Sequence, residues 1–126
     1  MFKFPKNDAK YAWTNHVARK MMFYGLSVNR IKRVVRNPKR SEKGVAPETI
    51  AVMQPSSAKA PAGKAWKEEV WVMYAQKQGN KNPKTNIPDF GKKVIITAWR
   101  YPGISPIRDE IPIPADILEE LRSIKY

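Results

Sequence analysis

The sequence predicts an α+β fold: two N-terminal helices packed on an antiparallel sheet of three to four strands, followed by a C-terminal helix. Three observations support this fold class. Apolar residues recur at helical spacing over residues 10–36 and again over residues 115–125. Between them, three short segments are rich in β-branched and aromatic residues. An antiparallel sheet with the helices on one face is the simplest arrangement that buries such elements.

The first helix is predicted over residues 10–24, a segment without Gly or Pro. Thr14 offers an alternative start, because its side chain can act as an internal N-cap. Gly25 fits the position just after the helix, where a left-handed backbone costs glycine little. The apolar face of this helix consists of Trp13, Val17, Met21 and Tyr24.

The second helix is predicted from Ser27, as its N-cap, to about Arg36. The pair Asn37-Pro38 ends it, because a residue that precedes proline disfavours the helical conformation. Its apolar face consists of Val28, Ile31, Val34 and Val35.

Three strands are predicted over residues 49–54, 69–77 and 92–100, each bounded by turn-forming residues. The segments 55–67 and 78–91 between them are predicted loops. Connections this long are uncommon in a small domain and are often functional or disordered.

The C-terminal part is predicted as an extended, proline-rich connector followed by a helix over residues 115–125. The acidic residues of this helix come early and the basic ones late, as the helix dipole prefers. With 126 residues, we expect a single domain over residues 1–126, with a core over about 8–101 and the connector and last helix at 102–126.

The composition excludes several function classes. The chain has no cysteine and one histidine, which excludes a disulfide scaffold, a cysteine nucleophile, a thiolate zinc site and a multi-histidine metal site within one chain. We therefore expect no metal and no cofactor. No apolar run approaches the ~18–20 residues of a membrane span, and the N-terminus lacks the apolar stretch of a secretory signal. We expect a cytoplasmic protein with no membrane partner.

The charge is high and unevenly distributed. The formal net charge is +13, and the pI is near 10.1. Residues 1–40 contain 11 basic residues and one acidic residue, Asp8, whereas residues 41–126 contain 13 basic and 10 acidic residues. Such a positive end favours polyanions, of which nucleic acid is the commonest. The alternative is a basic protein whose charge only prevents association.

One segment resembles a known family. The run from His16 to Ser27 contains His, Ala-Arg, Met and Gly-Leu-Ser in that order, followed by a helix and Asn37-Pro38, and later by a strand at residues 94–98. This pattern resembles small, uncharacterised bacterial domains of the BrnT type and, more distantly, the RelE/ParE toxins, over about residues 8–101. The resemblance implies two helices packed on an antiparallel sheet, RNA cleavage or ribosome-linked toxicity, and an acidic antitoxin as a partner.

Four residues are candidates for metal-free RNA cleavage, which needs a base, an acid and a cation that stabilises the developing charge. His16 is the side chain whose ordinary pKa lies near neutrality. Arg19 and Lys20 follow three and four positions later and so share its helix face. Arg100 is predicted at a strand end that can present it to the same site. The alternative is a packing histidine beside a solvated basic face.

The second predicted helix carries a basic face that can lie along a phosphate backbone. Trp66, in a predicted loop, is the best candidate for an exposed aromatic that stacks on a base. The basic candidates for nucleic-acid binding are Arg30, Lys32, Arg33, Arg36, Lys39 and Arg40.

Three functions remain open at this point. The first is an RNA-directed, toxin-like domain, with metal-independent ribonuclease activity. The second is a non-catalytic module that binds RNA, including ribosomal RNA. The third is a protein-interaction domain whose basic end meets an acidic partner. Nucleic-acid contact is common to the first two.

Overall fold

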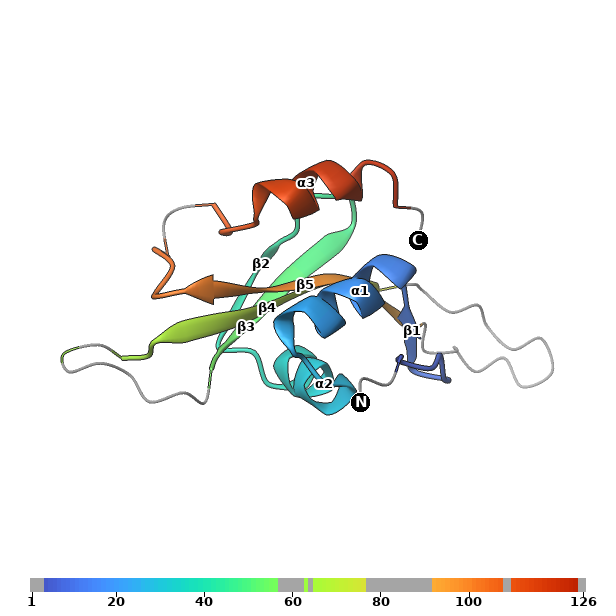
Figure 1. Ribbon diagram of the computed structural model, residues 1–126, viewed down its shortest axis with the longest axis horizontal. Coiled ribbons are helices and arrows are strands. Elements are labelled where there is room, and N and C mark those ends of the chain that lie inside the picture. The colour runs from blue at the N-terminus through green and yellow to red at the C-terminus, as the bar shows by residue number, and fades with distance from the viewer. Residues whose placement is uncertain (1–3, 57–62, 64, 77–91, 108–109, 125–126) are drawn as a thin grey trace, which may run out of the picture.

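The computed structural model describes residues 4–56, 63, 65–76, 92–107 and 110–124. These residues fold into the predicted α+β class, and Figure 1 shows the elements from blue to red in chain order. The elements are β1 (Tyr11–Trp13), α1 (Asn15–Tyr24), α2 (Val28–Arg36), β2 (Arg40–Lys43), β3 (Thr49–Pro55), β4 (Glu68–Gln76), β5 (Lys93–Pro102) and α3 (Ala115–Leu121).

The five strands form one sheet in the order β1-β5-β4-β3-β2. From β2 to β5 each strand is antiparallel to its neighbour, and Trp71 of β4 lies opposite Trp99 of β5. β1 instead runs parallel to β5, with Tyr11 beside Lys93. The prediction of an antiparallel sheet of three to four strands is therefore wrong at the edges: β1 and β2 bring the sheet to five strands, and the parallel strand β1 makes it mixed.

β4 is buried on both of its faces. Successive side chains of a strand point to opposite faces, so Val70 and Val72 pack against α1 and α2, whereas Trp71 and Met73 face the other way. The first cluster also contains Val17, Met21, Leu26, Ile31 and Val34 from the two helices and their connection.

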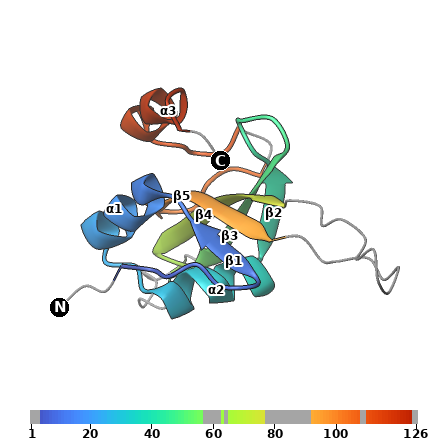
Figure 2. The same cartoon turned by 90° about the vertical axis from the view of Figure 1, so that its right-hand side faces the viewer.

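α3 covers the second face of the sheet. Figures 1 and 2 show α1 and α2 on one side and α3 on the other. Ile117 of α3 is fully buried in one cluster with Trp71 and Trp99, whose rings stack with centroids 5.9 Å apart. The expectation that all helices lie on one face is wrong. An almost continuous apolar strand needs a cover on each side.

The first helix begins five residues later than its predicted start at Lys10. Tyr11–Trp13 form β1, and Asn15 is the first residue of α1. Thr14 is the N-cap, and its hydroxyl accepts a hydrogen bond from the Val17 N–H, so the alternative start is confirmed. The preceding residues are held in the sheet by pairing with β5, a long-range contact that helical spacing does not reveal.

The turn between the two helices follows its prediction. Gly25 ends α1 with a φ of 68°, a left-handed conformation that favours glycine. Ser27 caps α2 by accepting a hydrogen bond from the Arg30 N–H, and the helix ends at Arg36, before Asn37. Local residue chemistry therefore determines both helix boundaries here.

β2 was not predicted, because its sequence, RSEK, has none of the apolar residues expected of a strand. It lies at the sheet edge and pairs with β3, with Ser41 opposite Val52. Charged residues are common on edge strands, where they discourage pairing with other chains.

The other element boundaries are close to their predictions. β3, β4 and β5 match the predicted strands 49–54, 69–77 and 92–100 to within about two residues at the ends that are described. α3 ends at Leu121, earlier than the predicted helix 115–125. The predicted loop 78–91 and most of the loop 55–67 lie outside the described residues.

Replacing Thr14 by alanine should destabilise the fold by about 2 kcal/mol, the upper end of the range for an N-cap. Two hydrogen bonds are lost, the cap to Val17 and the bond that the Thr14 hydroxyl donates to the Ile96 carbonyl at 2.7 Å. Thr14→Ser keeps both bonds and is the control. Urea unfolding measures the difference, and equal midpoints for the two variants would contradict this role.

Candidate functional site

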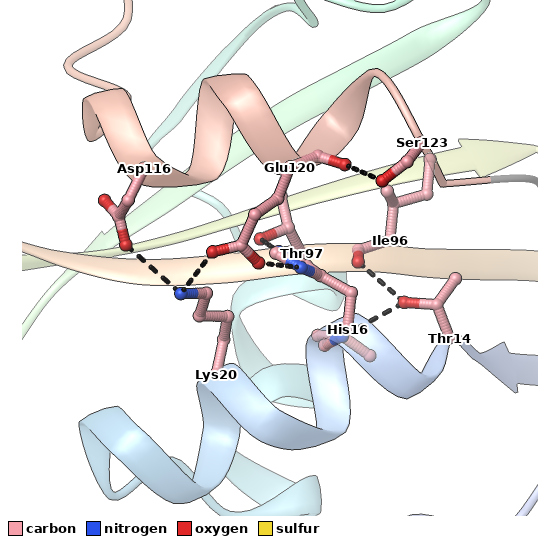
Figure 3. A network of polar contacts seen from close by, with 9 residues as sticks. Thr14, His16, Lys20, Ile96, Thr97, Asp116, Glu120 and Ser123 are labelled. Carbon is pink, nitrogen blue, oxygen red and sulfur yellow. Dashed lines mark hydrogen bonds and ion pairs between the residues drawn. The ribbon is translucent and has the colours of Figure 1, made fainter.

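α1 runs along the edge of β5 beyond the short segment that β1 covers. At its start, the Thr14 N–H and hydroxyl donate to the carbonyl oxygens of Ile95 and Ile96. At its end, the Arg100 guanidinium of β5 donates to the Tyr24 carbonyl at 2.7 Å. Fixed at both ends, the helix directs His16 and Lys20 past the sheet edge toward α3, as Figure 3 shows.

His16 links three elements. Its side chain is almost fully buried; Nε2 lies 2.8 Å from the Thr97 Oγ1 of β5, and Nδ1 lies 2.9 Å from the Glu120 Oε2 of α3 (Figure 3). A neutral imidazole with its proton on Nδ1 satisfies both contacts, because Nδ1 then donates to the carboxylate and Nε2 accepts from the hydroxyl.

Burial lowers the pKa of His16 below its ordinary value, since it disfavours the charged form. Glu120 opposes this shift, whereas Lys20 and Arg19 reinforce it. The net lowering keeps the imidazole neutral at pH 7.

Lys20 lies beside two carboxylates of α3. Its Nζ is 3.2 Å from the Asp116 Oδ2 and 3.3 Å from the Glu120 Oε1. Burial on its own lowers the pKa of Lys20, but the hydrogen bonds to Asp116 and Glu120 outweigh it, so the pKa is raised. Its hydrogen bond to Asp116 in turn lowers the pKa of that carboxyl group. Lys20 is therefore a charged link between α1 and α3.

Arg19 and Arg100 do not join this cluster. Arg19 is exposed and lines a hollow of about 460 Å³ together with His16 and Ser123, but its side chain contacts neither Glu120 nor Asp116. Arg100 lies at the opposite end of α1, where its guanidinium pairs with Glu68 at 2.7 Å. Eight residues of helix, about 12 Å, separate His16 from Tyr24. The structure therefore brings together His16 and Lys20, but not the four predicted catalytic residues.

α2 presents the basic face that its sequence predicts. Arg33 and Arg36 are exposed, and Arg36 Nε donates to the Lys32 carbonyl at 3.3 Å. Arg30 instead turns inward, toward the side chain of Gln54 and the carbonyl of Pro55, where it joins α2 to the end of β3. Of these four cations, Arg33 and Arg36 are the most accessible to a ligand.

A basic hollow of about 450 Å³ lies between α2 and the segment before β1. Lys32 is held here between the Asp8 carboxylate, 3.7 Å away, and the ring of Tyr11. Asp8 accepts hydrogen bonds from the backbone N–H groups of Tyr11 and Lys10, which lower the pKa of its carboxyl group. The polar lining residues are Asp8, Lys10, Tyr11, Asn29, Lys32 and Arg36.

Arg40 belongs to the other face of the sheet. Its side chain is 8% exposed, lies over the ring of Trp71 and donates to the Ser105 hydroxyl at 2.8 Å. Glu69 is fully buried close by and accepts hydrogen bonds from the Trp71 indole at 3.0 Å and the Ser105 N–H at 3.1 Å. These contacts fasten the connector that follows β5 to the sheet.

Trp66 is half-buried rather than freely exposed. Its indole N–H donates to Glu69 at 3.0 Å, and the ammonium group of Lys39 lies 5.4 Å from its ring centroid. Lys39 itself is exposed. Trp66 therefore holds part of the second apolar cluster together and already has a cation on its ring.

Sequence reasoning missed three residues of the polar cluster, namely Thr97, Asp116 and Glu120. Lys20 and Glu120 are 100 positions apart, so no local spacing connects them. The early acidic residues of α3 were a visible signal, but they fit the helix dipole equally well. Their role depends on where the chain places α3, which sequence alone does not determine.

The described ranges contain no group of three or more histidine, aspartate or glutamate residues able to hold a metal ion. Within the same ranges, no helix is both long enough and apolar enough to cross a bilayer.

No protein-family model matches this chain, and the searches of curated proteins and of solved structures return no match. The resemblance to BrnT and RelE/ParE domains therefore stays a prediction.

Stability should fall as the pH falls through about 6.5, the ordinary pKa of histidine. Because the folded-state pKa of His16 is lowered, the unfolded chain binds the proton first, so this contribution is complete above pH 6.5 and is lost on acidification toward the folded-state pKa. His16→Gln keeps hydrogen-bonding groups but cannot titrate, and should flatten the profile between pH 7 and 5. Urea unfolding at several pH values tests this, and identical profiles would refute it.

Proposed function

We propose that this protein binds RNA through the exposed basic face of α2 and the hollow beside it, without requiring a catalytic step. The observation that carries the proposal is a helix with four cations and no acidic residue, two of whose arginines, Arg33 and Arg36, are exposed. Lys10 adds one further cation in the hollow beside this helix. Phosphate groups are the ligands that such a surface favours.

The arrangement of the helix supports backbone contact. Its apolar residues Ile31, Val34 and Val35 are buried against the sheet, so the basic residues between them are directed outward. Arginine can donate two parallel hydrogen bonds to one phosphate group. The positive charge of this surface favours any polyanion. The family resemblance favours RNA, including ribosomal RNA, among them.

The contacts of three candidate catalytic residues separate this proposal from the catalytic one. Both ring nitrogens of His16 face protein groups, and Lys20 contacts two carboxylates. Arg100 is occupied at the end of α1. The candidate catalytic groups therefore serve the fold in this conformation, whereas Arg33 and Arg36 remain available. Binding an acidic antitoxin is a further proposal that the same basic face supports.

Changing Arg33 and Arg36 together to glutamate should weaken RNA binding by roughly 2 kcal/mol, or roughly thirtyfold, at about 1 kcal/mol for each lost ion pair. Affinity should also fall steeply with salt, because phosphate contacts release counterions. Fluorescence anisotropy with a labelled single-stranded RNA measures both effects, and the same sequence as DNA tests the preference for RNA.

The control is Lys92→Glu with Arg122→Glu, which makes the same change in net charge at two exposed residues, one just before β5 and one just after α3. It should weaken binding only slightly, since distant exposed charges are screened. A salt-independent affinity, or equal losses for the two double variants, would contradict binding through α2.

A metal-independent ribonuclease is the second candidate, and one observation favours it. His16 lies between a hydroxyl and a carboxylate, and its lowered pKa leaves it neutral, as a general base must be. Lys20 and Arg19 are the nearby cations that oppose its protonation.

If His16 is catalytic, RNA cleavage should persist in EDTA, and His16→Ala should slow it by on the order of 10²–10⁴. Arg19→Ala should have a comparable effect if Arg19 faces the developing charge. Gel analysis of a labelled RNA measures the rates, and circular dichroism confirms that the variants fold. Wild-type protein that binds RNA and leaves it intact would exclude this candidate.

A further inference from the structure

We propose that Lys20 and His16 form a second phosphate-binding position for the RNA, and that the carboxylates of α3 occupy it in this structure. α3 would then compete with RNA from within the same chain. The proposal rests on RNA binding for its ligand, but not on the α2 surface, and its test separates the two.

The geometry is that of an occupied oxyanion site. Lys20 Nζ lies 3.2 Å from an oxygen of Asp116 and 3.3 Å from an oxygen of Glu120. The other oxygen of Glu120 lies 2.9 Å from His16 Nδ1 (Figure 3). An ammonium and an imidazole N–H thus converge on the oxygens of one carboxylate, and the same donors suit a phosphate group.

The donors on α1 and the carboxylates on α3 differ in how exposed they are. The side chains of Lys20 and His16 are 14% and 2% exposed, whereas those of Asp116 and Glu120 are 61% and 41% exposed. The two donors on α1 are therefore largely buried, whereas the carboxylates lie at the surface. α3 is anchored through Ile117, which is fully buried, so the carboxylates can rotate away while the helix stays packed.

The position of Lys20 on α1 would let the RNA that binds α2 reach it as well. α1 and α2 lie on one side of the sheet, joined through Gly25 (Figures 1 and 2). Arg19, next in sequence to Lys20, is exposed, and among the described residues its side chain has no hydrogen-bond or ion-pair partner. A phosphate backbone that reaches Lys20 therefore meets a further cation beside it.

The test uses isosteric variants of the full chain. Asp116→Asn with Glu120→Gln removes the two negative charges beside Lys20. It leaves amide oxygens that can still accept hydrogen bonds from Lys20 and His16. Glu110→Gln with Glu119→Gln removes two exposed charges that do not contact Lys20 and is the matched control.

The first double variant should bind single-stranded RNA about three- to tenfold more tightly at low salt, in line with exposed ion pairs. The slope of the logarithm of its affinity against the logarithm of the salt concentration should steepen by the amount expected for about one additional phosphate contact. The control should gain less than about twofold, with an unchanged slope. Equal affinities and slopes in the two double variants, with binding still dependent on Arg33 and Arg36, would overturn the inference and leave the proposed function standing.

A second measurement does not depend on RNA. His16 is the one histidine of the chain, so its imidazole resonances are unambiguous in NMR spectra. Inorganic triphosphate should shift them in the Asp116→Asn, Glu120→Gln variant, and adding Lys20→Gln should abolish the shift. A shift without RNA binding would refute the proposed function but support the phosphate position. No shift would refute the position itself.

Discussion

The central constraint on this structure is that β4 and β5 bury both of their faces. Trp71 and Trp99 stack on one side, and Val70, Val72 and Ile95 pack on the other. Each face needs its own cover, so α1 and α2 cover the face with the valines, and the connector with α3 covers the face with the two tryptophans. The helices that cover the two faces come into contact at the sheet edge, where α1 and α3 meet beside β5.

This meeting place explains the polar cluster. The first cover carries cations, and α3 carries acidic residues in its first turns. Where the covers approach one another, Lys20 and His16 face Asp116 and Glu120 across the edge, and Thr97 completes the contacts from the strand between them. The cluster thus holds the two layers together, and it separates a basic surface on one side from an acidic helix on the other.

The sequence was informative wherever a few neighbouring residues determine the outcome. Thr14, Gly25 and Ser27 place the helix ends, and β-branched runs place β3, β4 and β5. The sequence was uninformative where pairing with another strand determines the conformation. β1 is held in the sheet by β5, and the charged strand β2 is held by β3.

The candidate site shows the same division. In sequence, Arg30, Arg33 and Arg40 are similar cations near one another. In the folded chain Arg30 joins α2 to the end of β3, Arg33 is exposed, and Arg40 is buried over an indole ring.

The parallel pairing of β1 with β5 also has a kinetic consequence. Thr14 and Ile96 are 82 positions apart, so at ribosomal rates of 5–20 residues per second about 4–16 s pass between their syntheses. During that interval β2, β3 and β4 can already pair, but α1 lacks β5, the strand on which it packs. Contacts between such distant segments slow the folding of a small domain.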